Sequence, residues 1–344
     1  MDDPVLQKVA LGPQWPTIDP FLFCAHHDDA YPRANGRMGP DASLAGRDIG
    51  QDFAGIDGWR MYHGSTVPGF PVHPHRGFET VTYVRKGIID HADSLGAAAR
   101  FGRGDVQWLT AGRGIQHSEM FPLLDSDGPN PLELFQIWLN LSASDKFVDP
   151  YFTMFPAKDL PRLVAGEGDG PKAEITVIAG TLEGTEPATP PAAPPNSWAS
   201  RDDADVAIWH IVLEPGATWT LPRATGDETV RTLYVFDGQA LRVAGHADDL
   251  GVDTGAVVRS DVDLELSSER GVEVLLLQGR PIGEPVARYG PFVMNTEDEI
   301  RQTFDDYRAT SFGGWPWPAP DPVHQDRGRF ARHDDGRIED LEPA

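Results

Sequence analysis

Two stretches of sequence decide the fold of this chain. The first is G-F-P-V-H-P-H-R-G-F-E-T-V-T-Y-V, from Gly69 to Val84, and the second is G-D-V-Q-W-L-T-A-G-R-G-I-Q-H-S-E-M, from Gly104 to Met120. The first contains the β-branched and aromatic run 80–84, which favours a strand, and the second contains a turn marked by Gly112 and Gly114. Short strands between glycine-marked turns predict a small β-barrel.

Four side chains in these stretches could hold one metal ion. Alternate residues of a strand point to the same face. His73 and His75 should therefore project together from one strand, and His117 and Glu119 from another. The alternative is that H-P-H is a surface loop and that His117 caps a turn, but two such pairs with a strand between them favour a metal site.

The donor set of this predicted site suits first-row divalent ions. Three imidazoles and a carboxylate are compatible with iron, manganese, nickel, copper or zinc. Four protein ligands in an octahedral arrangement leave two positions open, whereas a structural zinc site is closed. The pattern therefore indicates a catalytic rather than a structural ion.

Glu79 competes with Glu119 for the position of the carboxylate ligand. It has the same parity as His73 and His75, so a regular strand would bring it toward the same point. Gly77 permits a bulge or twist that would aim Glu79 elsewhere. The residues alone leave both carboxylates open as ligands.

The motifs resemble those of the pirin family of the cupin superfamily. The resemblance covers most of the chain. Besides the two stretches quoted above, it rests on H-A-D-S-L-G (91–96), L-F-Q-I-W-L-N-L (134–141) and E-P-V-A-R-Y-G-P-F-V-M-N-T-E-D-E-I (284–300). It implies an all-β bicupin, with two jelly-roll β-barrel domains in tandem and a few short helices. It also implies one ion per chain, usually Fe(2+), held by His73, His75, His117 and Glu119. Glu79 would then support the site without binding the ion.

The expected domain organisation follows from the same comparison. Residues 1–145 would form the N-terminal, metal-binding cupin, with an irregular insertion at about 24–66 that could cover the barrel mouth. Residues 146–163 would form a connector, 164–296 a C-terminal cupin without metal, and 297–344 a helix followed by a tail that docks through Trp315 and Trp317. A second metal site at His26, His27, Asp28 and Asp29 is not expected, because consecutive strand residues face opposite ways.

The second half shows the strand pattern of the first half without its histidine motif. Tyr234 to Gly238 resembles Tyr83 to Gly87, but His210 and His246 are isolated. Residues 207–222 are predicted to form two paired strands about a turn at 215–216. Residues 297–309 show helical spacing of apolar residues after a capping position at 295–296.

Two functions are compatible with this site. The first is an iron-dependent dioxygenase acting on flavonols such as quercetin, an oxidoreductase activity associated with several pirins, in which Glu119 is both ligand and general base. The alternative is a metal- or redox-dependent regulator that binds a protein partner through the surface around Arg76 and Arg113. A structural, inactive site is disfavoured because the set contains no closed cysteine cage.

Composition limits the partners. The net charge is −24 with a pI near 4.7, so the surface repels phosphate backbones and anionic lipid, and we expect neither nucleic acid nor membrane as partner. The single cysteine, Cys24, excludes an intrachain disulfide and is expected to be a buried apolar residue. The absence of a signal-type start or a long apolar stretch predicts a cytoplasmic protein, and we expect a monomer.

Overall fold

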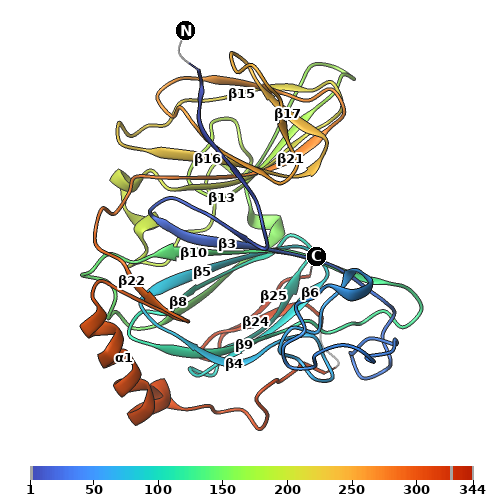
Figure 1. Cartoon of the computed structure of the whole chain (residues 1–344), viewed down its shortest axis with the longest axis vertical. Coiled ribbons are helices and arrows are strands. Elements are labelled where there is room, and N and C mark those ends of the chain that lie inside the picture. The colour runs from blue at the N-terminus through green and yellow to red at the C-terminus, as the bar shows by residue number, and fades with distance from the viewer. Residues whose placement is uncertain (1–2, 326–327, 343–344) are drawn as a thin grey trace. The chain divides into compact units, whose positions relative to one another are not determined.

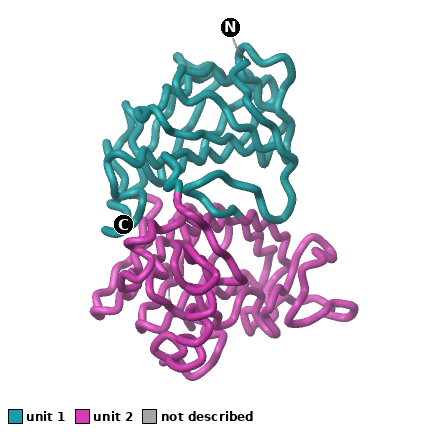
Figure 2. Tube along the Cα trace, turned by 60° about the vertical axis from the view of Figure 1, so that its left-hand side comes forward, with its two compact units in different colours: residues 1–24, 159–283 teal, residues 25–158, 284–344 magenta. Residues whose placement is uncertain are grey.

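The computed structural model (Figure 1) describes residues 3–325 and 328–342. The chain divides into two compact units (Figure 2). Unit 1 comprises Met1–Cys24 and Asp159–Gly283, and unit 2 comprises Ala25–Lys158 and Glu284–Ala344. The sequence of unit 2 is therefore interrupted by most of unit 1. The predicted domain bounds stay a prediction.

Unit 2 is built from two sheets whose strands are antiparallel. One sheet contains β11, β8, β5, β10 and β3 in that order, and the other contains β25, β24, β7, β6, β9 and β4. Apolar side chains of both sheets form a single core, with Val84 and Leu109 from the first and Ile89 and Phe101 from the second. The strands are β3 (Phe21–Tyr31), β4 (Gly69–His75), β5 (Phe78–Lys86), β6 (Ile88–Asp93), β7 (Ala98–Gly102), β8 (Val106–Thr110), β9 (Ile115–Met120), β10 (Asn130–Asn140), β11 (Tyr151–Phe155), β24 (Phe330–Arg332) and β25 (Ile338–Asp340), together with the hairpin β22 (Ala287–Tyr289) and β23 (Phe292–Met294).

Unit 1 has the same construction. One sheet has the order β1, β19, β16, β21, β14, β13, β12, and the other has the order β15, β20, β17, β18. Trp209 of the first sheet packs edge-on against Trp219 of the second, within one apolar core. The strands are β1 (Val5–Ala10), β2 (Gln14–Trp15), β12 (Arg162–Ala165), β13 (Ala173–Ala179), β14 (Ala207–Leu213), β15 (Thr218–Leu221), β16 (Val230–Gly238), β17 (Ala240–Val243), β18 (Leu250–Gly251), β19 (Thr254–Val258), β20 (Leu264–Ser267) and β21 (Val272–Gly279).

The strand orders show that the two units repeat one architecture. The series β8, β5, β10, β3 of unit 2 matches β19, β16, β21, β14 of unit 1, and the series β4, β9, β6, β7 matches β15, β20, β17, β18. The prediction of an all-β chain with two jelly-roll barrels is confirmed.

The helix expected at 297–309 is present as α1 (Glu297–Thr310). It begins with a capping box, in which the Thr296 side chain accepts a hydrogen bond from the Glu299 backbone and the Glu299 carboxylate accepts one from the Thr296 backbone. The other helical segments of the described residues are single 3-10 turns, η1 (Ile56–Gly58), η2 (Ala157–Asp159), η3 (Trp198–Ser200), η4 (Asp202–Ala204) and η5 (Ser311–Gly313). Within the described ranges, every helix is too short or too polar to cross a bilayer.

Two predictions about local structure are wrong. Residues 207–222 do not form a hairpin: β14 and β15 lie in different sheets, because the turn at 214–217 carries the chain from one face of the barrel to the other. The insertion is also shorter than predicted, since residues 24–31 continue strand β3. Its later residues Trp59, Met61 and Tyr62 are buried in the core of unit 2.

The tail contacts unit 2 at several points, and Cys24 is buried. The indole N–H of Trp317 donates to the Asp93 carbonyl at 2.8 Å, and that of Trp315 donates to the Ala319 carbonyl at 2.7 Å. Strand β24 extends the tail onto β7 of unit 2. Cys24 is fully buried, and this burial raises the pKa of its thiol, so the residue is an inert part of the interior.

Candidate metal centre

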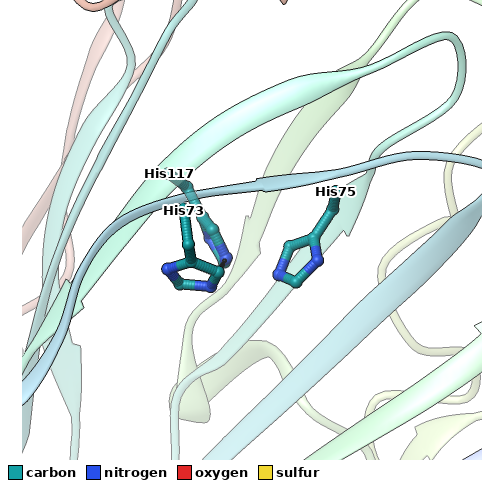
Figure 3. A group of neighbouring side chains, drawn as sticks. All are labelled: His73, His75 and His117. Carbon is teal, nitrogen blue, oxygen red and sulfur yellow. Dashed lines mark hydrogen bonds between the residues drawn. The ribbon is translucent and has the colours of Figure 1, made fainter. Parts of the chain in front are cut away.

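Three histidines from two neighbouring strands converge in unit 2. His73 of β4 lies directly opposite His117 of β9 in the antiparallel ladder, and His75 follows two residues later on the same face of β4. Figure 3 shows the three rings turned toward a common space. One nitrogen of each ring lies within 4.8 Å of the others. Among the described residues, no other set of three or more His, Cys, Asp or Glu side chains meets this condition.

Hydrogen bonds fix the tautomers of the two histidines of β4. The Nδ1 atom of His73 lies 2.9 Å from the Pro71 carbonyl oxygen, and that of His75 lies 3.4 Å from the Pro291 carbonyl oxygen. A carbonyl oxygen only accepts, so each Nδ1 carries the proton and each Nε2 presents a lone pair. This is the arrangement in which a protein carbonyl orients a metal-binding imidazole.

Burial keeps the three imidazoles neutral. Burial, with smaller contributions from the nearby histidines His63 and His91, lowers the pKa of His73 to about 4, although the hydrogen bond to the Pro71 carbonyl opposes the shift. Burial also lowers the pKa values of His75 and His117 well below the ordinary value. Because a metal binds the neutral ring, the triad needs no deprotonation at neutral pH before it can accept an ion.

The distances within the triad fit a divalent ion. Nε2 of His73 and Nε2 of His117 are 2.9 Å apart. Two nitrogens bound about 2.1 Å from one ion at right angles are separated by about 3.0 Å. Nε2 of His75 is buried and has no hydrogen-bond partner in the part of the chain that the structure describes. A buried acceptor without a partner is costly, and an ion would satisfy it.

Glu119 lies beside the triad and is held by two other side chains. Its Oε2 is 3.9 Å from Nε2 of His117 and accepts a hydrogen bond of 2.6 Å from Gln136. Its Oε1 accepts a longer one, 3.4 Å, from the hydroxyl of Thr82. Burial raises the pKa of Glu119, while these hydrogen bonds and His91 oppose the rise. The carboxylate is thus next to the three nitrogens but outside the tight cluster, and its role as fourth ligand stays a prediction.

Glu79 is directed to a different partner. It is fully buried on β5, and its Oε1 accepts a hydrogen bond of 2.6 Å from the hydroxyl of Thr110, the residue opposite it on β8. Glu79 is absent from the group whose atoms converge. The nearby Gly77, with φ of 83°, separates β4 from β5 and removes the regular strand geometry that made Glu79 a candidate.

The residues His26 to Asp29 do not converge on one point, because His26 contacts Glu133 while His27 and Asp29 share the hydroxyl of Tyr62. His26 lies 3.2 Å from Glu133, His27 lies 2.8 Å from the hydroxyl of Tyr62, and that hydroxyl donates to Asp29 at 2.6 Å. Alternation along β3 turns neighbouring side chains in opposite directions, as the sequence predicted. His210 and His246 are also used elsewhere, since they contact Glu273 and Asp3 at 2.8 Å.

Aromatic side chains surround the triad. Trp138 lies edge-on to His75, with ring centroids 5.4 Å apart, and stacks on Phe78 at 3.9 Å. Phe70 lies 6.3 Å from His73, and His63 of the insertion lies 5.6 Å from Phe70. Flat apolar groups next to an ion site suit an aromatic ligand.

Sequence reasoning missed the side chains that position Glu119. Gln136 is a polar residue in the otherwise apolar run L-F-Q-I-W-L of β10, and Thr82 has the parity of Thr80 and Val84 on β5. A single amide side chain in a buried strand indicates that a buried hydrogen-bond partner lies nearby. The identity of that partner required the pairing of β10 with β5 and of β9 with β6.

The fold and the site together define a class of protein: a tandem cupin in which one barrel carries a histidine triad. Family models agree with this class, since the model described as Pirin matches residues 5–139 and the model described as Pirin C-terminal cupin domain matches residues 208–313. The chain belongs to the pirin family.

Individual relatives support the same assignment. A pirin-like protein of Solanum lycopersicum is 34% identical over 281 residues, which cover 78% of this chain and 86% of the relative. A Pseudomonas aeruginosa protein whose name proposes quercetin 2,3-dioxygenase activity is 37% identical over 243 residues, covering 70% of this chain and 79% of its own. The crystal structure of quercetin 2,3-dioxygenase from Acinetobacter baumannii has a TM-score of 0.69 at 24% identity, with 91% of this chain and 99% of that chain covered, and so shows the shared fold.

Proposed function

We propose that this protein is a metal-dependent dioxygenase that acts on a flavonol such as quercetin. The convergence of His73, His75 and His117 on one point is the observation that carries this proposal. The relative in P. aeruginosa whose name proposes this activity is consistent with it. We further propose that Glu119 completes the ligand set and that the ion is Fe(2+), with manganese, nickel, copper and zinc as alternatives.

A bound divalent ion supplies Lewis acidity, which lowers the pKa of a hydroxyl that lies next to a carbonyl. In this proposal the chain supplies the remaining functions. Glu119, oriented by Gln136 and Thr82, accepts the proton of the flavonol hydroxyl. Trp138 beside His75 and Phe70 beside His73 supply apolar aromatic surroundings that suit a flat ring system.

The test begins with the protein as purified without added metal. Elemental analysis should give about one first-row ion per chain, and oxygen uptake should follow when quercetin is added. Luteolin, which lacks the hydroxyl next to the carbonyl, should be inactive. His117→Ala should lose both the ion and oxygen uptake, whereas His210→Ala, a matched change at a histidine of unit 1, should retain both.

Two outcomes reject the proposal. One is undiminished oxygen uptake after the ion has been stripped, since the activity would then not depend on metal. The other is a stoichiometric ion with no oxygen uptake for any flavonol in a panel, whichever of the five metals is supplied. The second outcome would leave a metal-binding protein of a different function.

The regulatory alternative placed Arg76 on the surface around the barrel mouth. Arg76 is buried and is held by Asp306 at 2.7 Å, by Thr303 and by the Arg113 carbonyl. It is therefore committed to the interior of unit 2. Arg113 is exposed and pairs with Asp149 at 2.9 Å. No contact of these two residues favours the alternative, so we keep the enzymatic proposal.

A further inference from the structure

Unit 1 contains a cavity of about 620 Å³ at one end of its barrel. The cavity lies where β13 and β21 end and where β14 and β16 begin. Parts of the loops 180–206 and 222–229 contribute to its lining. The residues used below are Glu183, Ala199, Arg201, Asp202, Asp205, Trp209, Trp219, Arg223, Arg231 and Gln278, all of which line the cavity. The proposed enzymatic site in unit 2 makes no use of this space.

Arg231 is a buried cation that has only neutral partners. Only 1% of the surface of this residue is exposed. Nε donates to the amide oxygen of Gln278 at 2.7 Å, and Nη1 donates to the Pro222 carbonyl at 2.8 Å. Within residues 3–325 and 328–342 it forms no ion pair, so several N–H groups of the guanidinium remain available. A buried guanidinium without a direct ion pair is costly, and an anionic ligand in the cavity would offset that cost.

Asp205, one of the acids that line the cavity, is hydrogen-bonded to a neighbouring loop. Both carboxylate oxygens of Asp205 accept hydrogen bonds from the loop 225–229: from the backbone and hydroxyl of Thr225, from the backbone of Gly226 and from the hydroxyl of Thr229, at 2.7–3.1 Å. Asp205 therefore shapes the loop beside the cavity, and its charge acts on Arg231 without a direct ion pair among the described residues. Burial lowers the pKa of Arg231 to about 10, and Asp205 and Asp263 oppose this, so the guanidinium is charged at neutral pH.

The strand pairing places Arg231 at the position that Glu79 has in the other barrel. Each is the second residue of its strand, β16 or β5. Arg231 lies opposite Val258 of β19 and Gln278 of β21. Glu79 lies opposite Thr110 of β8 and Leu139 of β10, the matching strands. The charge at this point is thus reversed between the two barrels, and the cavity of unit 1 contains no histidine.

We propose that this cavity is a binding site for a small organic monoanion, whose carboxylate pairs with Arg231 and whose flat apolar body lies against Trp209 and Trp219, which also line the cavity. A bidentate carboxylate matches the fork of a guanidinium. Apart from Arg231, the cavity has two further arginines, Arg201 and Arg223, against the three acids Glu183, Asp202 and Asp205. With Arg231 included, three arginines match three acids, so the lining has no excess positive charge to hold a doubly charged phosphate, and the expected partner of a monoanion is Arg231 itself.

Benzoate is the probe, and isothermal titration calorimetry on the full chain is the measurement. We expect one benzoate per chain, and at least tenfold weaker binding of benzamide and of phenyl phosphate. Arg231→Met should weaken benzoate binding at least tenfold, and Arg231→Lys should weaken it less. Arg242→Met, at an exposed arginine of unit 1, is the control and should leave binding unchanged. His117→Ala should also leave it unchanged, which separates this site from carboxylate binding to a metal.

A second variant keeps the proposal testable if Arg231→Met fails to fold. Ala199→Trp places a large side chain in the cavity from the half-buried helix η3 and leaves Arg231 intact, so it should abolish benzoate binding. The site assignment is wrong if benzoate does not bind at about 10 mM, roughly ten times a weak dissociation constant of about 1 mM. It is also wrong if Ala199→Trp binds benzoate normally. Tighter binding of phenyl phosphate than of benzoate would overturn the choice of a monoanion.

Discussion

His73 and His117 show how single residues create the candidate site. Their Nε2 atoms lie 2.9 Å apart because antiparallel pairing of β4 and β9 places the two residues directly opposite each other. The sequence predicted which histidines share a face, because strand parity is a local property. It left open which carboxylate accompanies them, because that depends on partners such as Gln136 and Thr110, which are distant in sequence.

Glu133 provides a test of electrostatics at the residue scale. It is buried, which raises its pKa, but the hydrogen bond from His26 and the cations Arg85 and Lys86 outweigh burial and lower the pKa to about 2. The unfolded chain binds the proton near pH 4.5. The carboxylate therefore stabilises the folded state above pH 4.5, and this contribution is lost as the pH falls from about 4.5 to about 2.

The matching variant is Glu133→Gln. At pH 7 it should reduce the free energy of unfolding by about 2–3 kcal/mol. Urea unfolding at pH 7, 4.5 and 3 should show the difference from wild type shrinking as the pH falls. Asp41→Asn, at an exposed ion pair with Arg33, is the control and should change the free energy by less than about 1 kcal/mol. An equal cost of Glu133→Gln at all three pH values would show that packing, not charge, is responsible.

At the scale of elements, Gly77 determines how β4 passes into β5. Its φ of 83° lies in the left-handed region, and a Cβ at this position would lie 2.0 Å from the Val293 carbonyl oxygen. The lysine ammonium of Lys146 donates to the carbonyls of both Gly77 and Val293, at 2.8 and 3.3 Å, and so fixes the two segments together. Strand β4, with its two histidines, is thereby held against the segment after Glu284.

We therefore expect Gly77→Ala to destabilise the protein by more than about 2 kcal/mol, because it combines a strained φ with a steric clash. Gly96→Ala is the matched control: its φ of 91° is similar, but nothing lies within 4 Å of the added Cβ. It should cost only about 1 kcal/mol. Thermal unfolding of both variants measures the difference. Equal costs would mean that φ alone matters and that the approach to Val293 relaxes easily.

Some elements were predictable from the sequence and others were not. Helix α1 was predictable because its cap at Thr296 and its apolar spacing are both local. The hairpin predicted at 207–222 was wrong because a turn sequence gives the direction of the next strand but not the sheet that it joins. The continuation of β3 through residues 24–31 was missed because polar residues there contact partners that the linear sequence does not show.

At the scale of the whole molecule, the two barrels share a strand order but differ in the chemistry of their interiors. The repeat was visible in the sequence because Tyr83 to Gly87 and Tyr234 to Gly238 end matching strands, β5 and β16. The cavity of unit 1 could not be predicted, because Arg231 is part of no motif and the residues that line the cavity with it are distant in sequence.

Ion binding should therefore affect one unit only. With Zn²⁺ as a redox-inert probe at about 100 times its dissociation constant, binding should stabilise the site by about 2.7 kcal/mol and slow hydrogen exchange in β4 and β9 by up to about 100-fold. Exchange in the matching strands β15 and β20 of unit 1 should not change. Equal protection of β15 and β20, or none in β4 and β9, would contradict an ion site confined to the histidine triad.

Unit 2 is assembled from two parts of the chain that are separated by residues 159–283. His75 takes the carbonyl of Pro291 as its ring partner, 216 positions later in the sequence. A nascent chain leaving the ribosome thus presents its three histidines long before the residue that orients one of them has been translated. Metal capture should accordingly be a late event in biosynthesis, and premature termination between His117 and Pro291 would release a polypeptide with every histidine of the triad yet without its finished binding pocket.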